Sequence, residues 1–238
     1  MQTKKISTTI LVLLFALAIV SPMISTIRAG VTGTLDFVRP DNLVPGAPIE
    51  VDTSGITEMD GGTAYFYLSL DDDPVISSGD VYVTSVKRED VVNASEYITL
   101  WTPTTIEAGD YYLKITDLKR VGSSAKVAYL RTITVLEEED WPVITIDPEA
   151  GTVNSTITVS GSGLDDYSTV EILWESYDGE SLANATVVDG EFEVEIPGAI
   201  PDAFEGTYKI IIAASNEETL TTYTTFMVEK GLLIIIEG

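Results

Sequence analysis

Four aspartates in one short stretch, Asp71, Asp72, Asp73 and Asp80, have the side chains best suited to hold a metal ion. Calcium binds several hard oxygen ligands supplied by a flexible loop, and clustered aspartates provide such oxygens. The ligand spacing of an EF-hand is missing, so two interpretations stay open, a calcium site and a solvated acidic loop. The acidic run 137–140 is a further candidate, because it lies at the junction of two domains and a cation held there would stiffen their connection; Asp165-Asp166 is another acidic pair that could bind a cation.

The composition does not favour catalytic chemistry. The chain contains neither histidine nor cysteine, which removes the usual general base near neutral pH, the Ser-His and Cys-His pairings, and thiolate or imidazole metal ligands. Pairs of carboxylates occur at this density whatever the function, and no glycine-rich phosphate loop stands between a strand and a helix. We therefore expect a protein without enzymatic activity, and calcium is the one cofactor that the sequence suggests.

The charge distribution indicates a location outside the cytoplasm. Lys4 and Lys5 precede an apolar run, and small residues follow as far as Ala29, which is the pattern of an export signal over residues 1–29. An uncleaved membrane anchor is the alternative, because nothing between Lys5 and Arg28 is charged. The formal net charge of the chain is −25, and such a surface repels phosphate groups. We expect no binding to nucleic acid, and no membrane contact beyond the N-terminal segment.

Three glycosylation sequons agree with an extracellular location. They begin at Asn93, Asn154 and Asn184, and each lies near a predicted turn or strand end, where a glycan can be accommodated. The sequence therefore predicts a glycoprotein exposed at the cell surface.

The chain contains an internal duplication. The segment 38–56 aligns with 146–164 at a constant offset, with prolines and alternating aliphatic residues in register. Further on, AGDYYLKI (108–115) aligns with EGTYKIII (205–212) at a shorter offset. The first copy therefore contains an insertion, which we place around residues 70–90.

Both copies have the hydrophobic pattern of β-strands. Apolar and polar residues alternate in stretches such as TAYFYL (63–68) and EFEVEI (191–196), which is the period of a strand with one buried face. Turn residues separate these stretches, and Asp189-Gly190 is typical of a two-residue type I′ hairpin. No helical period follows the export signal. Many short strands separated by turns predict an all-β chain of sandwiches rather than a parallel sheet.

Particular residues of both copies resemble the immunoglobulin fold. GDYYL (109–113) and GTYKI (206–210) resemble the segment in which a tyrosine begins strand F and hydrogen-bonds back to the preceding backbone, the tyrosine corner. Trp174 stands where that fold buries a core tryptophan on strand C. The resemblance implies a tyrosine corner at Tyr111 and another at Tyr208.

A more specific resemblance extends over the second copy. ITIDPEAGTVNSTITVSGSGL, VVDGEFEVEIP and GTYKI resemble the IPT/TIG-like repeats of large prokaryotic surface proteins, including archaeal S-layer and adhesin-type chains. The resemblance covers most of residues 143–229 and, more loosely, residues 33–136. It implies tandem immunoglobulin-like β-sandwiches at a cell surface, and no particular ligand.

These observations divide the chain into a signal peptide, two sandwiches, an acidic linker and a terminal apolar strand, at residues 1–29, 30–137, 138–142, 143–230 and 231–238. The short linker predicts a stiff rod with the two sandwiches end to end. The last segment, LLIIIEG (232–238), looks like the first strand of a further repeat. Three interpretations stay open: a fragment of a longer array, a strand donated to another subunit, and a strand paired on an edge of the second sandwich.

Together these features predict a secreted structural protein of an S-layer or related envelope assembly. It would associate with itself or with neighbouring envelope proteins, and divalent cations would hold its acidic faces together. A filament subunit that polymerises by strand donation is one alternative, and it predicts that residues 30–38 or the terminal strand lie unpaired in the monomer.

An adhesin or glycan-binding module is the other alternative. It predicts an exposed patch lined by aromatic residues, for which the candidates are Tyr65, Tyr67, Tyr82 and Trp101. Aromatic residues on adjacent strands more often form cross-strand pairs, and we expect such pairs here.

Overall fold

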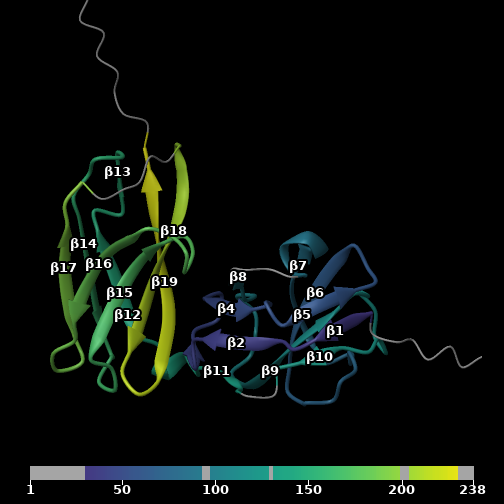
Figure 1. The fold of residues 1–238 in the computed structure, drawn as a ribbon. Coiled ribbons are helices and arrows are strands. Elements are labelled where there is room, and N and C mark those ends of the chain that lie inside the picture. Colours follow the sequence, from purple (N-terminus) through teal and green to yellow (C-terminus); the bar gives the residue numbers. More distant parts are fainter. Residues whose placement is uncertain (1–29, 93–96, 129–130, 199–203, 230–238) are drawn as a thin grey trace, which may run out of the picture.

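The structure is a computed structural model that describes residues 30–92, 97–128, 131–198 and 204–229 (Figure 1). The described residues form strands and two short 3₁₀ turns, η1 (Arg88–Asp90) and η2 (Glu138–Asp140), with no α-helix among them. Sheets pack face to face as sandwiches, which confirms the all-β prediction. The predicted export signal, the sequon at Asn93 and the segment LLIIIEG lie outside the described residues.

The strands fall into two successive groups, which we call the first and the second module. The first module contains β1 (Val31–Gly33), β2 (Asp36–Arg39), β3 (Asn42–Leu43), β4 (Pro48–Asp52), β5 (Ile56–Met59), β6 (Thr63–Ser69), β7 (Val81–Lys87), β8 (Ile98–Trp101), β9 (Gly109–Thr116), β10 (Lys126–Val127) and β11 (Ile133–Val135). The second module contains β12 (Val143–Asp147), β13 (Ala150–Gly151), β14 (Ile157–Ser162), β15 (Thr169–Trp174), β16 (Ser181–Thr186), β17 (Phe192–Ile196), β18 (Gly206–Ser215) and β19 (Thr219–Val228).

Both modules have the same sheet topology. One sheet has the order β2-β4-β8 in the first module and β12-β14-β17 in the second. The facing sheet has the order β3-β11-β9-β6-β7 in the first module and β13-β19-β18-β15-β16 in the second. In each case a two-residue strand, β3 or β13, pairs in parallel with the last strand of its own module. The duplication seen in the sequence is therefore a duplication of topology.

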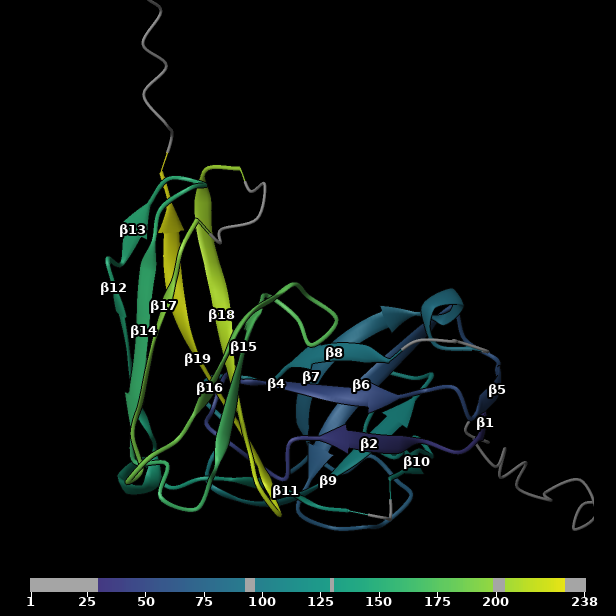
Figure 2. The ribbon, with the colours of Figure 1, turned by 60° about the vertical axis from the view of Figure 1, so that its left-hand side comes forward.

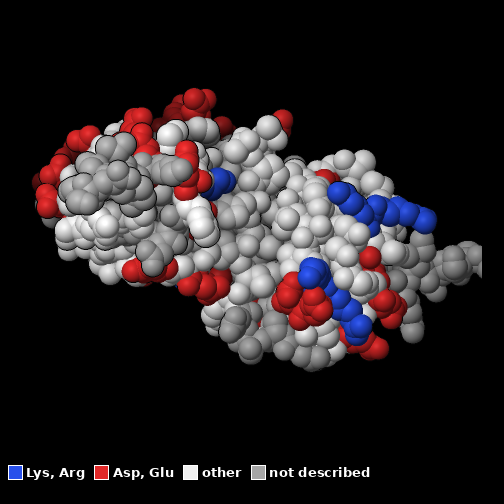
Figure 3. All heavy atoms as spheres, turned by 90° about the horizontal axis from the view of Figure 1, so that it is seen from above, with Lys and Arg blue, Asp and Glu red and all other residues white. Residues whose placement is uncertain are grey.

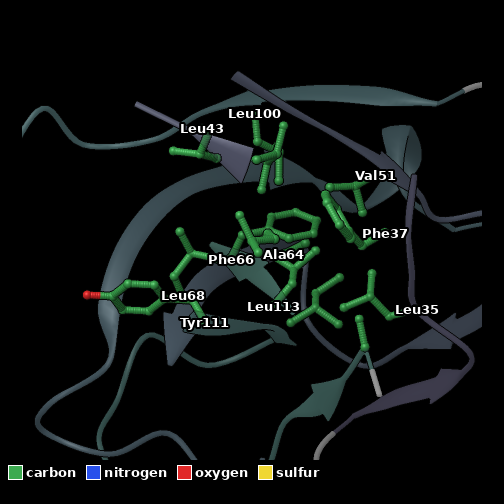
Figure 4. Close-up of a cluster of buried hydrophobic side chains, with 14 of the residues drawn as sticks. Leu35, Phe37, Leu43, Val51, Ala64, Phe66, Leu68, Leu100, Tyr111 and Leu113 are labelled. Atoms are coloured by element: carbon green, nitrogen blue, oxygen red, sulfur yellow. The ribbon is translucent and has the colours of Figure 1, made fainter. Parts of the chain in front are cut away.

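Each module has its own hydrophobic core between its sheets. The core of the first module is built around Phe66, which is buried completely among residues of the facing strands such as Phe37 and Leu100 (Figure 4). The core of the second module surrounds Phe226 and Trp174, and the Trp174 ring stacks on Tyr208 with ring centroids 4.9 Å apart. Alternate strand residues supply both cores, as the period-two pattern predicts.

Details of the repeat are also conserved between the modules. The Tyr111 hydroxyl donates to the Glu107 carbonyl oxygen at 3.0 Å, and the Tyr208 hydroxyl donates to that of Phe204 at 2.9 Å, so both expected tyrosine corners are present. The peptide bonds before the aligned prolines, Pro40 and Pro148, are both cis.

The predicted Asp189-Gly190 hairpin turn is present as well. Both residues have positive φ, 53° and 75°, as a type I′ turn requires.

The modules are joined by more than the linker. Strand β3 pairs with β11 on one edge and, also in parallel, with the start of β19 on the other edge. One sheet thereby runs through both modules. Figures 1 and 2 show the strands of the second module running across those of the first, which gives the molecule an L shape. The expected rod with modules end to end is therefore wrong, because pairing along β3 places the second module beside the first.

The first module carries segments that the second lacks. Strands β1 and β5 form an additional two-stranded sheet, and a loop at 70–80 is longer than its counterpart at 175–180. This loop confirms an insertion in the predicted region, and the segment 117–127 packs against it. Because β1 pairs with β5 and β2 pairs with β4, residues 31–33 and 36–39 are not unpaired in the monomer. Strand donation could use either of two segments. The other one, LLIIIEG, lies outside the described residues, so it stays the one candidate for a donated strand.

Candidate functional site

The aspartates of the predicted calcium loop separate into two kinds. Asp72 and Asp73 are exposed, whereas Asp71 and Asp80 approach the ammonium group of Lys114 on strand β9. The Nζ atom of Lys114 lies 2.8 Å from Asp71 Oδ1, 3.4 Å from Asp80 Oδ2, and 3.1 Å from the Val75 carbonyl oxygen. Among the described residues no group of three or more acidic side chains is arranged to hold a metal ion.

Lys114 is buried because two loops cover the outer face of its strand. The loop 70–80 and the segment 117–127 are joined there by backbone hydrogen bonds, for example Ile76 to Ser123 and Ala125 to Pro74. The Lys114 side chain has no exposed surface, and that of Asp80 is 1% exposed. The Asp80 carboxylate also accepts bonds from the hydroxyls of Ser69 and Ser77, each at 2.7 Å. Asp71 and Asp80 therefore form a structural ion pair network with an internal cation, and calcium binding by this loop stays a prediction.

The exposed member of this network provides a test by pH. The hydrogen bond from Lys114 is the main cause that holds the pKa of Asp71 below its ordinary value. A lowered native pKa gives stability that is complete above about pH 4, the unfolded value, and is lost as pH falls through the native value. We expect the free energy of unfolding of Asp71→Asn to fall below that of the native protein at pH 7. This difference should shrink between pH 4 and 2 in urea denaturation, and a difference independent of pH would contradict the assignment.

Two predicted glycosylation sites lie on the second module. Asn154 is exposed in the turn between β13 and β14, and Asn184 is exposed on β16 at the edge of the long sheet. A glycan at either position would extend into solvent. Glycosylation itself stays a prediction.

The aromatic residues proposed as a sugar platform have other contacts. Tyr67 and Tyr82 are a cross-strand pair with ring centroids 5.5 Å apart, which confirms the expected pairing, and they pack with Tyr65 against Ile76 and Ala125 of the covering loops. Trp101 lies between the modules, where its ring meets Tyr223 edge to face at 5.8 Å.

The contact between the modules, which we call the joint, is built around Tyr177. This side chain comes from the turn between β15 and β16 and is 5% exposed. Its hydroxyl hydrogen-bonds with Thr221 and donates to the Pro48 carbonyl oxygen of the first module at 3.3 Å. The guanidinium of Arg39 lies over its ring, 4.3 Å from the centroid, and burial raises the Tyr177 pKa far above its ordinary value. Both modules therefore hold this ring.

Other contacts fix the same joint. The Asp41 carboxylate accepts bonds from the backbone and the hydroxyl of Thr219, at 2.9 and 3.0 Å. The Lys209 ammonium lies 3.8 Å from the centre of the Trp101 ring and 4.7 Å from that of Tyr223. Burial lowers the pKa of Lys209. Backbone pairing, hydrogen bonds and cation–π contacts thus act together, so the two modules hold a defined angle.

Beside the joint lies a cleft of about 760 Å³, which we call the junction cleft. It is formed where η2, the loop after β14 and the turn between β18 and β19 meet. Its lining combines aromatic and aliphatic side chains with two amides and six carboxylates: Asn42, Leu136, Glu139, Asp140, Trp141, Gly163, Asp165, Asp166, Tyr167, Asn216, Glu217, Glu218 and Leu220. Sequence reasoning named 137–140 and 165–166 separately, and the structure brings parts of both runs to one cleft. The sequence did not indicate that Glu217 and Glu218 belong to the same cleft. They lie in the turn between β18 and β19, and no local pattern shows that this turn folds next to the linker.

Comparisons with known proteins give fold-level similarity alone. No family model and no curated protein matches the chain. Among solved structures, SGBP-B of the Bacteroides ovatus mixed-linkage glucan utilization locus, in complex with a mixed-linkage heptasaccharide, is 16% identical with a TM-score of 0.27. The match covers 83% of this chain and 47% of that one.

FdeC, an Escherichia coli adhesin, is 13% identical with a TM-score of 0.29, over 84% of this chain and 66% of that one. This chain thus spans about half of the first structure and about two thirds of the second. At these scores neither similarity carries an argument about function. The described residues contain no helix long and apolar enough to cross a membrane.

Proposed function

We propose that this protein is a non-enzymatic structural component of a prokaryotic cell surface, a rigid two-module building block of an S-layer or related envelope assembly. The joint is the observation that carries the proposal. A sheet continued through β3, together with the buried Tyr177 ring, fixes the angle between the modules, and a lattice requires subunits of fixed shape. The predicted export signal, the exposed sequons at Asn154 and Asn184, and the acidic surface support a location outside the cell.

The glycan-binding alternative is less well supported by the geometry. Of the aromatic residues that the sequence singled out for sugar binding, Tyr67 is covered by loops and Trp101 is held in the joint. Side chains that are committed to contacts within the protein cannot stack on a sugar. The same contacts are what a rigid scaffold needs.

The proposal is tested by assembly of the purified chain without residues 1–29. We expect a monomer whose small-angle X-ray scattering fits one L-shaped particle at low concentration. Sheets or fibres should appear by electron microscopy as concentration and ionic strength are raised, with calcium and with a chelator as separate series. Particles that stay monomeric at every protein, salt and calcium concentration would overturn the structural role.

A further inference from the structure

We propose that copies of this chain associate head to tail, with a basic loop of one copy docking in the junction cleft of the next. The loop, which we call the basic tip, comprises Leu118, Lys119, Arg120 and Val121 of the first module. The inference rests on the proposed function and deepens it. It names the partner as a second copy and assigns the two surfaces that meet.

The basic tip is a rigid, exposed and amphipathic element. All four of its residues are exposed, and Val121 is 60% exposed. Short backbone bonds hold its shape, from Arg120 to the Leu118 carbonyl at 2.8 Å and from Ser123 to that of Arg120 at 3.1 Å. The Gly122 amide donates to Ile76 of the neighbouring loop at 2.8 Å. Because the tip is already ordered, docking it costs little conformational entropy.

The cations of the tip are available for a partner. Arg120 forms no ion pair with any residue that the structure describes. Lys119 lies over the Tyr82 ring, 3.8 Å from its centroid, and remains exposed. The exposed apolar residues Leu118 and Val121 flank the two cations. Exposed apolar surface next to charged groups is typical of a protein-binding site.

The rest of the chain makes this pair distinctive. Residues 143–229 contain a single basic residue, Lys209, and it is held in the joint. Figure 3 shows acidic side chains over the second module, on the left, and most of the visible basic side chains over the first. Each molecule therefore has a strongly acidic part and a part that carries exposed cations. Charge complementarity between two copies therefore favours contact between different modules.

The junction cleft fits the tip in chemistry as well as charge. Asp166 and Glu217 are among the carboxylates that line the cleft, and a carboxylate is the group that accepts bidentate hydrogen bonds from a guanidinium. Tyr167 and Trp141 also line the cleft, and Trp141 is 39% exposed; aromatic rings of this kind make cation–π contacts with arginine and lysine. Leu136, which is half-buried, also lines the cleft and supplies apolar surface for the leucine and valine of the tip. A cleft of this volume is within the range of sites that enclose a small ligand, and so has room for projecting side chains.

The arrangement makes an interface that propagates. The tip lies on the first module, and the cleft lies where the second module meets the first. Each molecule therefore carries one tip and one cleft. A heterologous contact of this kind adds subunits without limit unless its rotation closes a ring. Chains of the rigid L-shaped unit would be the first level of an envelope assembly.

Opposed electrostatic effects predict a particular salt dependence. The net charge of −25 makes any two copies repel at low ionic strength. The Debye length falls to about 8 Å at 0.15 M salt, where this long-range repulsion is screened but direct contacts persist. Association should therefore be strongest near physiological ionic strength and weaker both below and above it, with no need for calcium.

The test uses charge reversals in the chain without residues 1–29, studied by sedimentation velocity in 0.15 M salt with a chelator. The tip variant is Lys119→Glu/Arg120→Glu, and the cleft variant is Asp166→Lys/Glu217→Lys. The matched control is Lys87→Glu/Arg88→Glu, an exposed basic pair of the same module. We expect each interface variant to associate at least about 100-fold more weakly, since like charges that face each other cost several kcal/mol. The control should associate like the native chain, and equal thermal unfolding should show that all variants are folded.

A mixture of the two interface variants gives the decisive result. The cleft variant keeps a native tip and the tip variant keeps a native cleft, so the mixture should associate although neither variant does so alone. Native assembly that survives the tip reversal, or that the control reversal weakens equally, would overturn this interface and leave the structural role standing. A native chain that does not assemble in any ionic condition would instead overturn the structural role.

Discussion

Replacement of Lys114 by methionine is expected to destabilise the first module by about 3–5 kcal/mol, the usual result of removing one partner from a buried ion pair. Methionine retains most of the volume of the side chain, so the loss is electrostatic. Asp80, with 1% of its side chain exposed, would be left in the interior without a cation. The serine hydroxyls that bond to it cannot replace a unit charge.

Urea denaturation followed by tryptophan and tyrosine fluorescence measures this effect. The double variant Lys114→Met/Asp80→Asn should recover a large part of the loss, because a neutral amide can still accept the bonds from Ser69 and Ser77. Lys126→Met is the control, since Lys126 is partly exposed on β10 and its replacement should change stability by less than about 0.5 kcal/mol. A small effect of Lys114→Met, or no recovery in the double variant, would contradict the network.

Short-range patterns in the sequence predict the parts of the fold that local residues determine. The Asp189-Gly190 turn follows from the need for positive φ at two successive residues. Both tyrosine corners follow from a tyrosine that recurs at the same place before strand F. Alternation along β17 identifies Phe192 and Ile196 as its buried residues. Each of these features is specified within a few residues, and each is present.

The network around Lys114 shows why other features were missed. Tyr111, Leu113 and Ile115 face the core on β9, so the intervening Lys114 is expected to face solvent. It is buried only because the loop 70–80 and the segment 117–127, which directly follows β9, fold over that face. Two of the four aspartates that suggested calcium, Asp71 and Asp80, are partners of this lysine. Their cation is supplied by a residue more than thirty positions away, and no spacing rule connects them.

The joint was missed for the same kind of reason. The linker between the modules is short, and a short linker by itself predicts two modules arranged end to end. The L shape depends on β3, a strand of two residues with no hydrophobic period, which pairs with the start of β19. Tyr177 lies in a turn that reads as solvent-exposed, SYDGE (176–180). Its burial depends on Arg39 and Pro48 in the other module, which local sequence does not reveal.

The second large effect is expected at the joint. Tyr177→Ala should lower the free energy of unfolding by about 3–5 kcal/mol, the usual cost of replacing a buried aromatic ring by alanine. The substitution removes the ring beneath Arg39 and the hydroxyl that contacts Thr221 and Pro48. Unlike the loss at Lys114, this loss falls on the contact between the modules. We expect the single unfolding transition to separate into two, because each module keeps its own core.

Measurements of shape distinguish this outcome from general destabilisation. Small-angle scattering of Tyr177→Ala in native buffer should change from one rigid L to a distribution of angles, while circular dichroism keeps its native strand signal. Tyr177→Phe should keep the angle and cost about 1–3 kcal/mol, because it leaves buried acceptors unpaired. Tyr97→Ala, at an exposed tyrosine, should change neither. If Tyr177→Ala kept the native scattering and one transition, the backbone pairing at β3 would be sufficient to fix the joint. If Tyr177→Ala loosened the angle between the modules and the protein still formed ordered assemblies, the assembly would not depend on a subunit of fixed shape.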